Sequence, residues 1–536
     1  MFRNIATLFL LIAVVVAMPP HYPTKVGHSC IVGAPRETPK DLSRGPIETC
    51  VILVQFTDNR ADTLNRTPAR YDSMFYSTGV YYGQYRQGSL NDFFKENSYN
   101  QTDVRGGICG NRWWMSNHTY AYYDDGNYML GTGYQLAHDA VQLVDATVNF
   151  HQYDLDNDNH IDGVFVVHAG PGGEDTGNPH QCWSHAIPSF NYTTNDGVVI
   201  DGATNVPEVN LVTPSLDTTL CCIGVMCHEL GHVVGLPDLY DYSRNTWGVG
   251  YWSLMGYGAW GAGGNTPWSP SHADAWCKKS VNWLSYTPIV SNVFGLRILD
   301  LETHPVAYRV WRNGAINDTF FILENRQNKG FDTPLPGSGL LIWHIDPRYG
   351  GTYHNVVDLE EADGCDDLDH GWGYRPDPHY YHHELGDSGD PYPGDSNNTL
   401  FGPNTYPSSN SNYGVPTNVI VRNITTVGDT VICDVLINQV GINEFNNEYS
   451  SEVYLKQNPV GKSLIIYYNF PNTEEIKVEV CDITGRIVEQ VFTGEITGKG
   501  VIRSEPKNLS EGVYFLKIEK GKMSKVQKFV FLGMNH

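Results

Sequence analysis

Residues 217–241 read DTTLCCIGVMCHELGHVVGLPDLYD and contain the pattern that decides the fold of the first half of the chain. Asp217 is a favourable helix N-cap, and the mostly apolar residues 218–234 predict a buried helix after it. His228 and His232 are four residues apart and therefore lie on one face of that helix. Two imidazole nitrogens on one face can bind a single Zn²⁺ ion.

The residues beside and after the two histidines supply the rest of a catalytic zinc site. Glu229 lies one position around the helix, where it reaches a metal-bound water rather than the metal, as a general base must. Gly235 predicts the helix end, because glycine accepts left-handed C-cap backbone, and Pro237 cannot continue the helix. The chain then returns Asp238 to the metal as a third ligand, with one position open for water. Two other carboxylates compete for that role: Asp241 and Glu208.

The stretch HELGHVVGLPD (228–238) resembles the extended zinc motif of metzincin peptidases in its aspartate form. The stretches GVGYWSLMGYGAWG (248–261) and HADAWCKKSVNWL (272–284) resemble the immune inhibitor A-like metalloproteases, and similarity extends from about residue 50 to 435. This resemblance implies an α/β metzincin-like zinc peptidase domain. It also implies Met255 as the methionine of a Met-turn beneath the zinc, and Tyr257 as a residue that stabilises the oxyanion.

These features predict a secreted zinc-dependent endopeptidase that hydrolyses peptide bonds in extracellular proteins through a zinc-activated water, with Glu229 as general base. The main alternative is a non-catalytic surface adhesin or glycan-binding protein on a protease scaffold. Loss of Glu229 or of a ligand would be its expected mark, and all four positions are intact. A zinc hydrolase that acts on non-peptide bonds would share the same metal chemistry.

Composition narrows the compartment and the partners. The chain has 536 residues and a formal net charge of −24 at pH 7, which argues against nucleic acid as a partner. Residues 1–17, with Arg3 before an apolar run and Val15-x-Ala17 at its end, predict a secretory signal peptide. A retained N-terminal anchor is the alternative. No later apolar stretch is long enough to span a membrane, so we expect a mature chain without a transmembrane segment. We also expect this chain to be monomeric.

The chain divides into several segments after the signal peptide. Residues 18–46 form a short N-terminal extension or propeptide, and residues 47–290 alternate strands with helices, as an α/β catalytic domain does. In residues 291–440 short strands between Gly, Pro, Asn and Asp clusters predict a β-sandwich-like accessory domain. Residues 441–452 are a polar linker, and residues 453–536 form a separate small β domain.

An acidic loop lies at residues 153–163, YDLDNDNHIDG. Its spacing resembles the loops that wrap Ca²⁺, with side-chain oxygens at positions 1, 3, 5 and 9 and a backbone carbonyl at position 7. A plain solvated acidic turn is the alternative, since no glutamate lies at position 12. The predicted structural calcium ligands are Asp154, Asp156, Asp158, the His160 carbonyl and Asp162.

The 11 cysteines show no repeating framework, so disulfide pairing cannot be deduced from them. Cys30 lies in the N-terminal extension, where it could cap the zinc as a latency switch. The favoured alternatives are a disulfide, for example with Cys50, or a free thiol.

The C-terminal segment 453–536 carries 12 Lys and Arg against 9 Asp and Glu, unlike the acidic remainder. The stretches LKQNPVGKSL, VEVCDITGRIV and NLSEGVYFLKIEKG resemble the sorting domain of the Bacteroidetes type IX secretion system. The resemblance implies an Ig-like β-sandwich, the type IX secretion machinery as a partner, and an extracellular or cell-surface product of a Gram-negative bacterium. An ordinary accessory binding module is the alternative.

Overall fold

The structure is a computed structural model that describes residues 16–17, 39–42, 45–83, 86–210, 220–242, 245–262, 266–348, 356–370, 385–437, 453–455, 460–506, 509–521 and 523–532. The chain divides into two compact units, residues 1–438 and residues 439–536. The predicted catalytic and β-rich segments therefore share one compact unit. The predicted signal peptide lies outside the described residues except for Val16–Ala17, and Cys30 also lies outside them.

The first unit begins with a seven-stranded mixed sheet. Its strands are β1 (Val16–Ala17), β2 (Ile47–Gln55), β3 (Val104–Met115), β4 (His160–Pro171), β5 (His185–Ile187), β6 (Tyr192–Thr193) and β7 (Val199–Val209). Their order is β1-β5-β7-β4-β2-β3, with β6 beside β7. Strands β2, β3, β4 and β7 pair in parallel, whereas β1, β5 and β6 pair antiparallel. The apolar strands β2 and β4 thus lie side by side inside this sheet.

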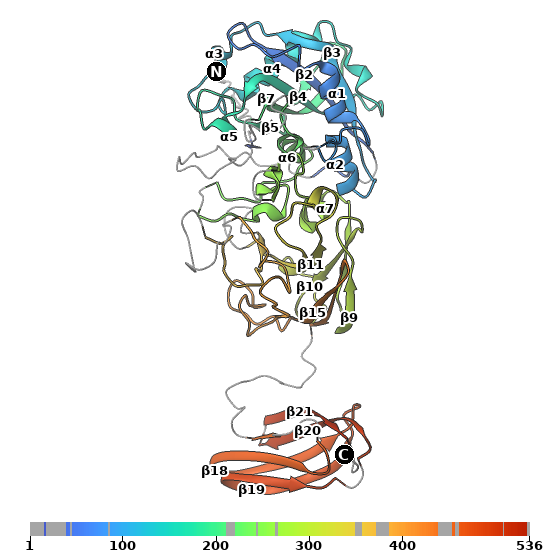
Figure 1. The fold of residues 1–536 in the computed structure, drawn as a ribbon, viewed down its shortest axis with the longest axis vertical. Coiled ribbons are helices and arrows are strands. Elements are labelled where there is room, and N and C mark those ends of the chain that lie inside the picture. Colours follow the sequence, from blue (N-terminus) through green and yellow to red (C-terminus); the bar gives the residue numbers. More distant parts are fainter. Residues whose placement is uncertain are drawn as a thin grey trace, which may run out of the picture. The chain divides into compact units, whose positions relative to one another are not determined.

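Both faces of the sheet are covered, as its continuous apolar runs predict. The helices are α1 (Pro68–Tyr76), α2 (Leu90–Asn97), α3 (Tyr120–Tyr123), α4 (Gly133–Asp145), α5 (Gly173–Thr176), α6 (Ile223–Val233) and α7 (Ala275–Ser280). In β2, Val51 and Leu53 enter the core shared with α1 and α6, while Ile52 and Val54 enter the core shared with α4. Figure 1 shows α6 between this sheet and the β-rich half of the unit.

Two further sheets complete the first unit. One has the order β13-β12-β11-β10-β8, and the other has the order β14-β15-β16-β9. Phe321 of β11 and Phe401 of β14 approach edge to face, with ring centroids 5.2 Å apart, so the sheets share a core. The predicted change from α/β to β structure is confirmed. The bounds are β8 (Ser285–Pro288), β9 (Val293–Ile298), β10 (Val306–Val310), β11 (Phe320–Arg326), β12 (Gly339–Ile345), β13 (Val357–Leu359), β14 (Leu400–Phe401), β15 (Ile420–Val427) and β16 (Thr430–Leu436).

The second unit is a five-stranded antiparallel β structure with its own core. Its strands are β17 (Val453–Leu455), β18 (Leu464–Cys481), β19 (Ile487–Ser504), β20 (Gly512–Lys520) and β21 (Met523–Phe531). The alternating apolar residues Val478 and Val480 of β18, and Leu516 and Ile518 of β20, are buried in that core. The predicted small β domain is confirmed, whereas its Ig-like identity stays a prediction.

Two helices of the first unit follow from features of their local sequence. Ser89 caps α2 through a capping box, in which its hydroxyl accepts from the Asp92 amide and the Asp92 carboxylate accepts from the Ser89 amide. The apolar period in residues 134–146 corresponds to α4. Within the described ranges, none of the helices has the length and apolar character needed to cross a membrane.

Candidate metal centre

Helix α6 carries the two histidines deep inside the first unit. All of its side chains are buried, and its Val233 packs against Gly163 of β4 and Gly202 of β7. The predicted helix start was wrong for the described residues 220–222, because the helix begins only after Cys222. The amide of Cys222 donates to the Asn210 side chain, and the amide of Cys221 donates to the Glu208 carbonyl. These long-range bonds hold the two residues out of the helix.

The helix ends where glycine was predicted to end it. Gly235 has φ +102°, a conformation that glycine adopts without strain. A Cβ atom there would also lie 2.6 Å from the Cα of Pro39, so the N-terminal segment passes directly over this turn. After the turn, the amide of Leu236 donates to the Gly231 carbonyl and the chain reverses toward the histidines. The sharp stop therefore places Asp238 opposite the face that carries His228 and His232.

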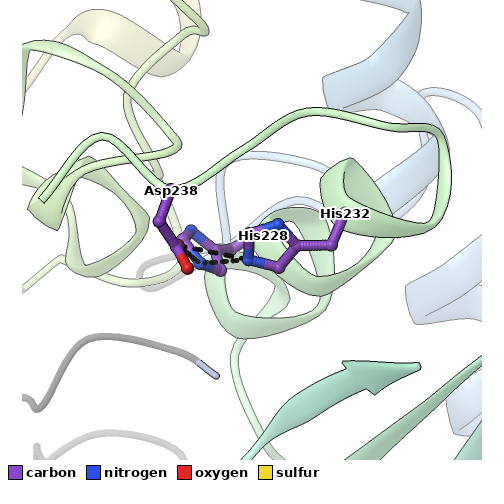
Figure 2. A group of neighbouring side chains, drawn as sticks. All are labelled: His228, His232 and Asp238. Carbon is purple, nitrogen blue, oxygen red and sulfur yellow. Dashed lines mark hydrogen bonds and ion pairs between the residues drawn. The ribbon is translucent and has the colours of Figure 1, made fainter. Parts of the chain in front are cut away.

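Three donor atoms converge at this point (Figure 2). The Nε2 atoms of His228 and His232 are 3.1 Å apart. The Oδ1 atom of Asp238 lies 3.1 Å from the first nitrogen and 3.2 Å from the second. Ligands of a tetrahedral zinc with bonds of about 2.0–2.1 Å are about 3.3–3.4 Å apart, so the spacing suits one zinc ion. Glu208 and Asp241, the competing carboxylates, are not part of this group.

The protonation of the two histidines makes the group fit a cation. The Nδ1 atom of His228 lies 2.9 Å from the Leu254 carbonyl, and that of His232 lies 2.8 Å from the Leu236 carbonyl. A carbonyl only accepts, so each Nδ1 carries the proton and each Nε2 presents a lone pair. Burial lowers the pKa of His228 and favours this neutral form. Two lone pairs therefore face the buried Oδ1 of Asp238, which has no hydrogen-bond partner among the described residues. A bound cation relieves their repulsion.

Asp238 is suited to be the anionic ligand. Burial alone would raise its pKa, but positive charge on the neighbouring His232 and His228 outweighs burial and holds the pKa below its usual range. Where both imidazoles are neutral, a bound cation would supply that positive charge instead. The carboxylate is therefore ionised at neutral pH although the residue is only 4% exposed.

Met255 lies under the helix, against the turn between the two histidines. A Cβ atom on Gly231 would be 2.8 Å from the Met255 sulfur, so only glycine permits this close approach. The turn before Met255 also provides the Leu254 carbonyl that accepts from His228. This placement agrees with the Met-turn that the family resemblance implies, although the role of Met255 stays a prediction.

Two tyrosines near the site pack in a row toward His228, and the proposed role of Tyr257 stays a prediction. Tyr257 is buried, with its ring centroid 5.8 Å from that of Tyr240, and the Tyr240 ring is 6.3 Å from His228. Tyr242, which the sequence analysis missed, donates its hydroxyl to Oδ2 of Asp238. Its spacing of four residues from Asp238 is the only signal that the sequence offered.

In the acidic loop, two of the predicted aspartates lie close to Glu48, which was not predicted as a ligand. Ligand oxygens of Asp154, Asp156 and Glu48 lie within 4.8 Å of one another. Glu48 comes from β2, more than a hundred positions earlier, and is 3% exposed. Burial raises its pKa to about 7, and the three nearest aspartates add to this effect.

Two of the other predicted calcium ligands, Asp158 and Asp162, have partners inside and outside the loop, respectively. The carboxylate of Asp158 accepts from the His160 amide at 2.7 Å. The carboxylate of Asp162 accepts from Lys40 and from the Glu48 amide. The structure thus brings Asp154 and Asp156 together with Glu48, while Asp162 is engaged by the N-terminal segment.

Two histidines and one carboxylate, with a glutamate next to the first histidine on the same helix, are the residues expected at the site of a metal-dependent hydrolase. Comparison with known families agrees with this class. Residues 49–284 match the immune inhibitor A peptidase M6 catalytic domain, and residues 458–532 match a secretion system C-terminal sorting domain. The chain therefore contains a peptidase M6 domain followed by a sorting domain, as the sequence predicted. The sorting domain assigns it to an extracellular or cell-surface location.

Relatives of known name cover only part of the chain. The pre-pro-metalloprotease PrtV of Vibrio cholerae is 28% identical over 245 residues, which cover 40% of this chain and 26% of PrtV. Immune inhibitor A of Bacillus thuringiensis subsp. alesti is 31% identical over 160 residues, which cover 26% of this chain and 23% of the relative. The chain thus spans about a quarter of the length of these relatives.

Proposed function

We propose that the protein is a secreted zinc-dependent endopeptidase that cleaves peptide bonds in extracellular proteins. The observation that carries the proposal is the convergence of His228, His232 and Asp238 on one point, with distances of 3.1–3.2 Å between their donor atoms. Glu229 follows the first ligand on the same buried helix. The match to the peptidase M6 catalytic domain supports peptide bonds as the substrate class.

The residues of the chain have separate parts in this reaction. When bound, zinc would polarise the scissile carbonyl and lower the pKa of a water molecule. Glu229 accepts a proton from the attacking water and later delivers it to the leaving amine. Met255 forms the apolar floor beneath the ligands. Tyr257 is proposed to stabilise the oxyanion, and kcat of Tyr257→Phe checks that role, with a fall of about 10²-fold expected from the loss of one such donor.

Removal of zinc tests the proposal. Casein hydrolysis by the secreted mature chain should stop when 1,10-phenanthroline, which binds zinc far more strongly than calcium, extracts the metal. Hydrolysis should return on addition of one equivalent of Zn²⁺, and new amino termini should appear in the products. A metal-free protein that still cleaves casein would refute the proposal. A zinc-loaded protein that cleaves no peptide bond would favour the adhesin or a hydrolase for other bonds.

We further propose a structural Ca²⁺ ion in the acidic loop, held by Asp154 and Asp156 with Glu48. The other predicted ligands, Asp158, the His160 carbonyl and Asp162, belong to the same proposal.

Calcium should raise the melting temperature of the first unit, because a ligand that binds only the folded state stabilises it. Glu48 has a pKa of about 7 and must lose its proton to bind the ion, so the affinity should rise from pH 6 to pH 8. Calcium titrations followed by thermal unfolding at both pH values measure this change. Glu48→Gln should reduce the calcium effect, and Asp72→Asn, an exposed change on α1, should not. A melting temperature that does not respond to calcium would contradict the site.

The domain boundaries and the export route complete the proposal. The sorting-domain match is consistent with the proposed export route. This route comprises a signal peptide over residues 1–17, an extension over residues 18–46 and recognition of residues 453–536 by the type IX secretion machinery. A monomeric mature chain and the alternative roles of Cys30 stay predictions. Mass spectrometry of the secreted product would locate its amino terminus and the state of this cysteine.

A further inference from the structure

Each of the three donor residues has one further partner on the side away from the convergence point. For His228 and His232 these partners are the main-chain carbonyls of Leu254 and Leu236. For Asp238 the partner is a side chain, since its Oδ2 accepts from the hydroxyl of Tyr242. The two oxygens of Asp238 are therefore divided, with Oδ1 toward the imidazoles and Oδ2 toward the tyrosine.

We propose that Tyr242 is a positioning residue that makes Asp238 a one-oxygen ligand of the catalytic metal. This inference rests on the proposed zinc site and concerns a residue outside the donor set. A free carboxylate can rotate and offer both oxygens to a metal. The phenol hydroxyl occupies Oδ2, and Oδ1 alone is left to bind. One position in the coordination shell then stays open for water.

The surroundings of Asp238 make this hydrogen bond difficult to replace. The residue is 4% exposed, so bulk water has little access to Oδ2. The Tyr242 ring is fixed by an edge-to-face contact with Tyr240, with centroids 5.1 Å apart. Tyr240 in turn lies beside His228, so the aromatic ring that aims the hydroxyl is packed onto the same ligand cluster. A phenol is also neutral, and it orients the carboxylate without neutralising the charge that the metal needs.

Tyr242→Phe tests the inference, because it removes one oxygen atom and keeps the ring. Zinc affinity of the full chain, measured by competition with a chromophoric chelator, should weaken about 10–100-fold, the usual effect of losing a partner of a metal ligand. The absorption spectrum of the Co²⁺-loaded protein should also change, since it responds to the number of ligand oxygens. Tyr123→Phe is the matched control, because Tyr123 donates to the Asp139 carboxylate at 2.9 Å, away from the metal centre. It should leave zinc affinity and the cobalt spectrum as in the wild type.

A double-mutant cycle separates positioning from a general loss of stability. In an Asp238→Asn background, Tyr242→Phe should have little further effect on zinc affinity, because both changes act through one ligand. Equal weakening in both backgrounds would overturn the inference, as would an unchanged affinity and spectrum in the single variant. Either result would still be compatible with the proposed peptidase activity. A wild-type protein that binds no zinc would overturn both.

Discussion

Glu229→Gln is expected to retain zinc and to lose at least ~10²-fold in kcat, the low end for removal of a general base. The glutamine amide occupies the same volume next to His228 but cannot accept the proton of the attacking water. Because the donor triangle consists of other residues, the metal content should stay at one zinc per chain. Peptide hydrolysis under saturating substrate, together with metal analysis of the same sample, measures both quantities.

Asp139→Asn provides a control for the loss of a carboxylate elsewhere. Asp139 lies on α4 and accepts from Tyr123, and its replacement should leave kcat near the wild-type value. A Glu229→Gln protein with wild-type turnover would show that another group accepts the proton. Loss of zinc from that variant would show instead that Glu229 contributes to the metal site itself.

Arg326→Met should destabilise the first unit by about 3–5 kcal/mol, the usual result of removing one partner from a buried ionic cluster. Arg326 is fully buried on β11 and lies 2.6 Å from Asp332 and 3.2 Å from both Glu302 and Glu324. It also donates to the Trp252 carbonyl at 2.9 Å, three residues before Met255. The variant should therefore weaken zinc binding as well as folding. Urea unfolding and chelator competition measure the two effects.

The destabilisation should depend on pH in a defined direction. Burial raises the pKa of Glu324 to about 7, and burial together with Asp332 raises that of Glu302 to about 8. Without the guanidinium, both groups can take up protons at pH 6 and remain neutral, whereas at pH 9 they are buried charges. The loss should therefore be smaller at pH 6 than at pH 9.

Arg348→Met is the control for the arginine substitution. The Arg348 side chain is 59% exposed and pairs with Asp346, so its loss should leave the free energy of unfolding close to the wild-type value. If Arg326→Met has the same free energy of unfolding at pH 9 as this control, the buried contacts of Arg326 do not stabilise the first unit.

The convergence of His228, His232 and Asp238 could be predicted from sequence because its geometry is local. His228 and His232 are fixed by helical spacing, and Gly235 and Pro237 define where the chain turns toward Asp238. The start of α6 could not be predicted, since it depends on hydrogen bonds from residues 221–222 to Glu208 and Asn210. Glu48 was missed for the same reason, because only the fold brings β2 beside the acidic loop.

The β-rich segment shows the same limit on a larger scale. Short strands between turn-forming residues in 291–440 indicated a separate accessory domain. The buried contacts of Arg326 with the turn at Trp252 join the two segments, and these contacts leave no periodic signal in the sequence. Family resemblance pointed to Tyr257, whose role stays a prediction, but it gave no sign of the Tyr242 hydroxyl that donates to Asp238.

The hydrogen-bond acceptors of the two imidazoles have an evolutionary consequence. Both are main-chain carbonyls, of Leu254 and Leu236, and no substitution of a side chain can delete a carbonyl. Codon changes at those two leucines alter packing but leave the acceptors in place. Substitutions can therefore disturb the orientation of Asp238, which depends on the Tyr242 side chain, much more readily than the orientation of His228 and His232.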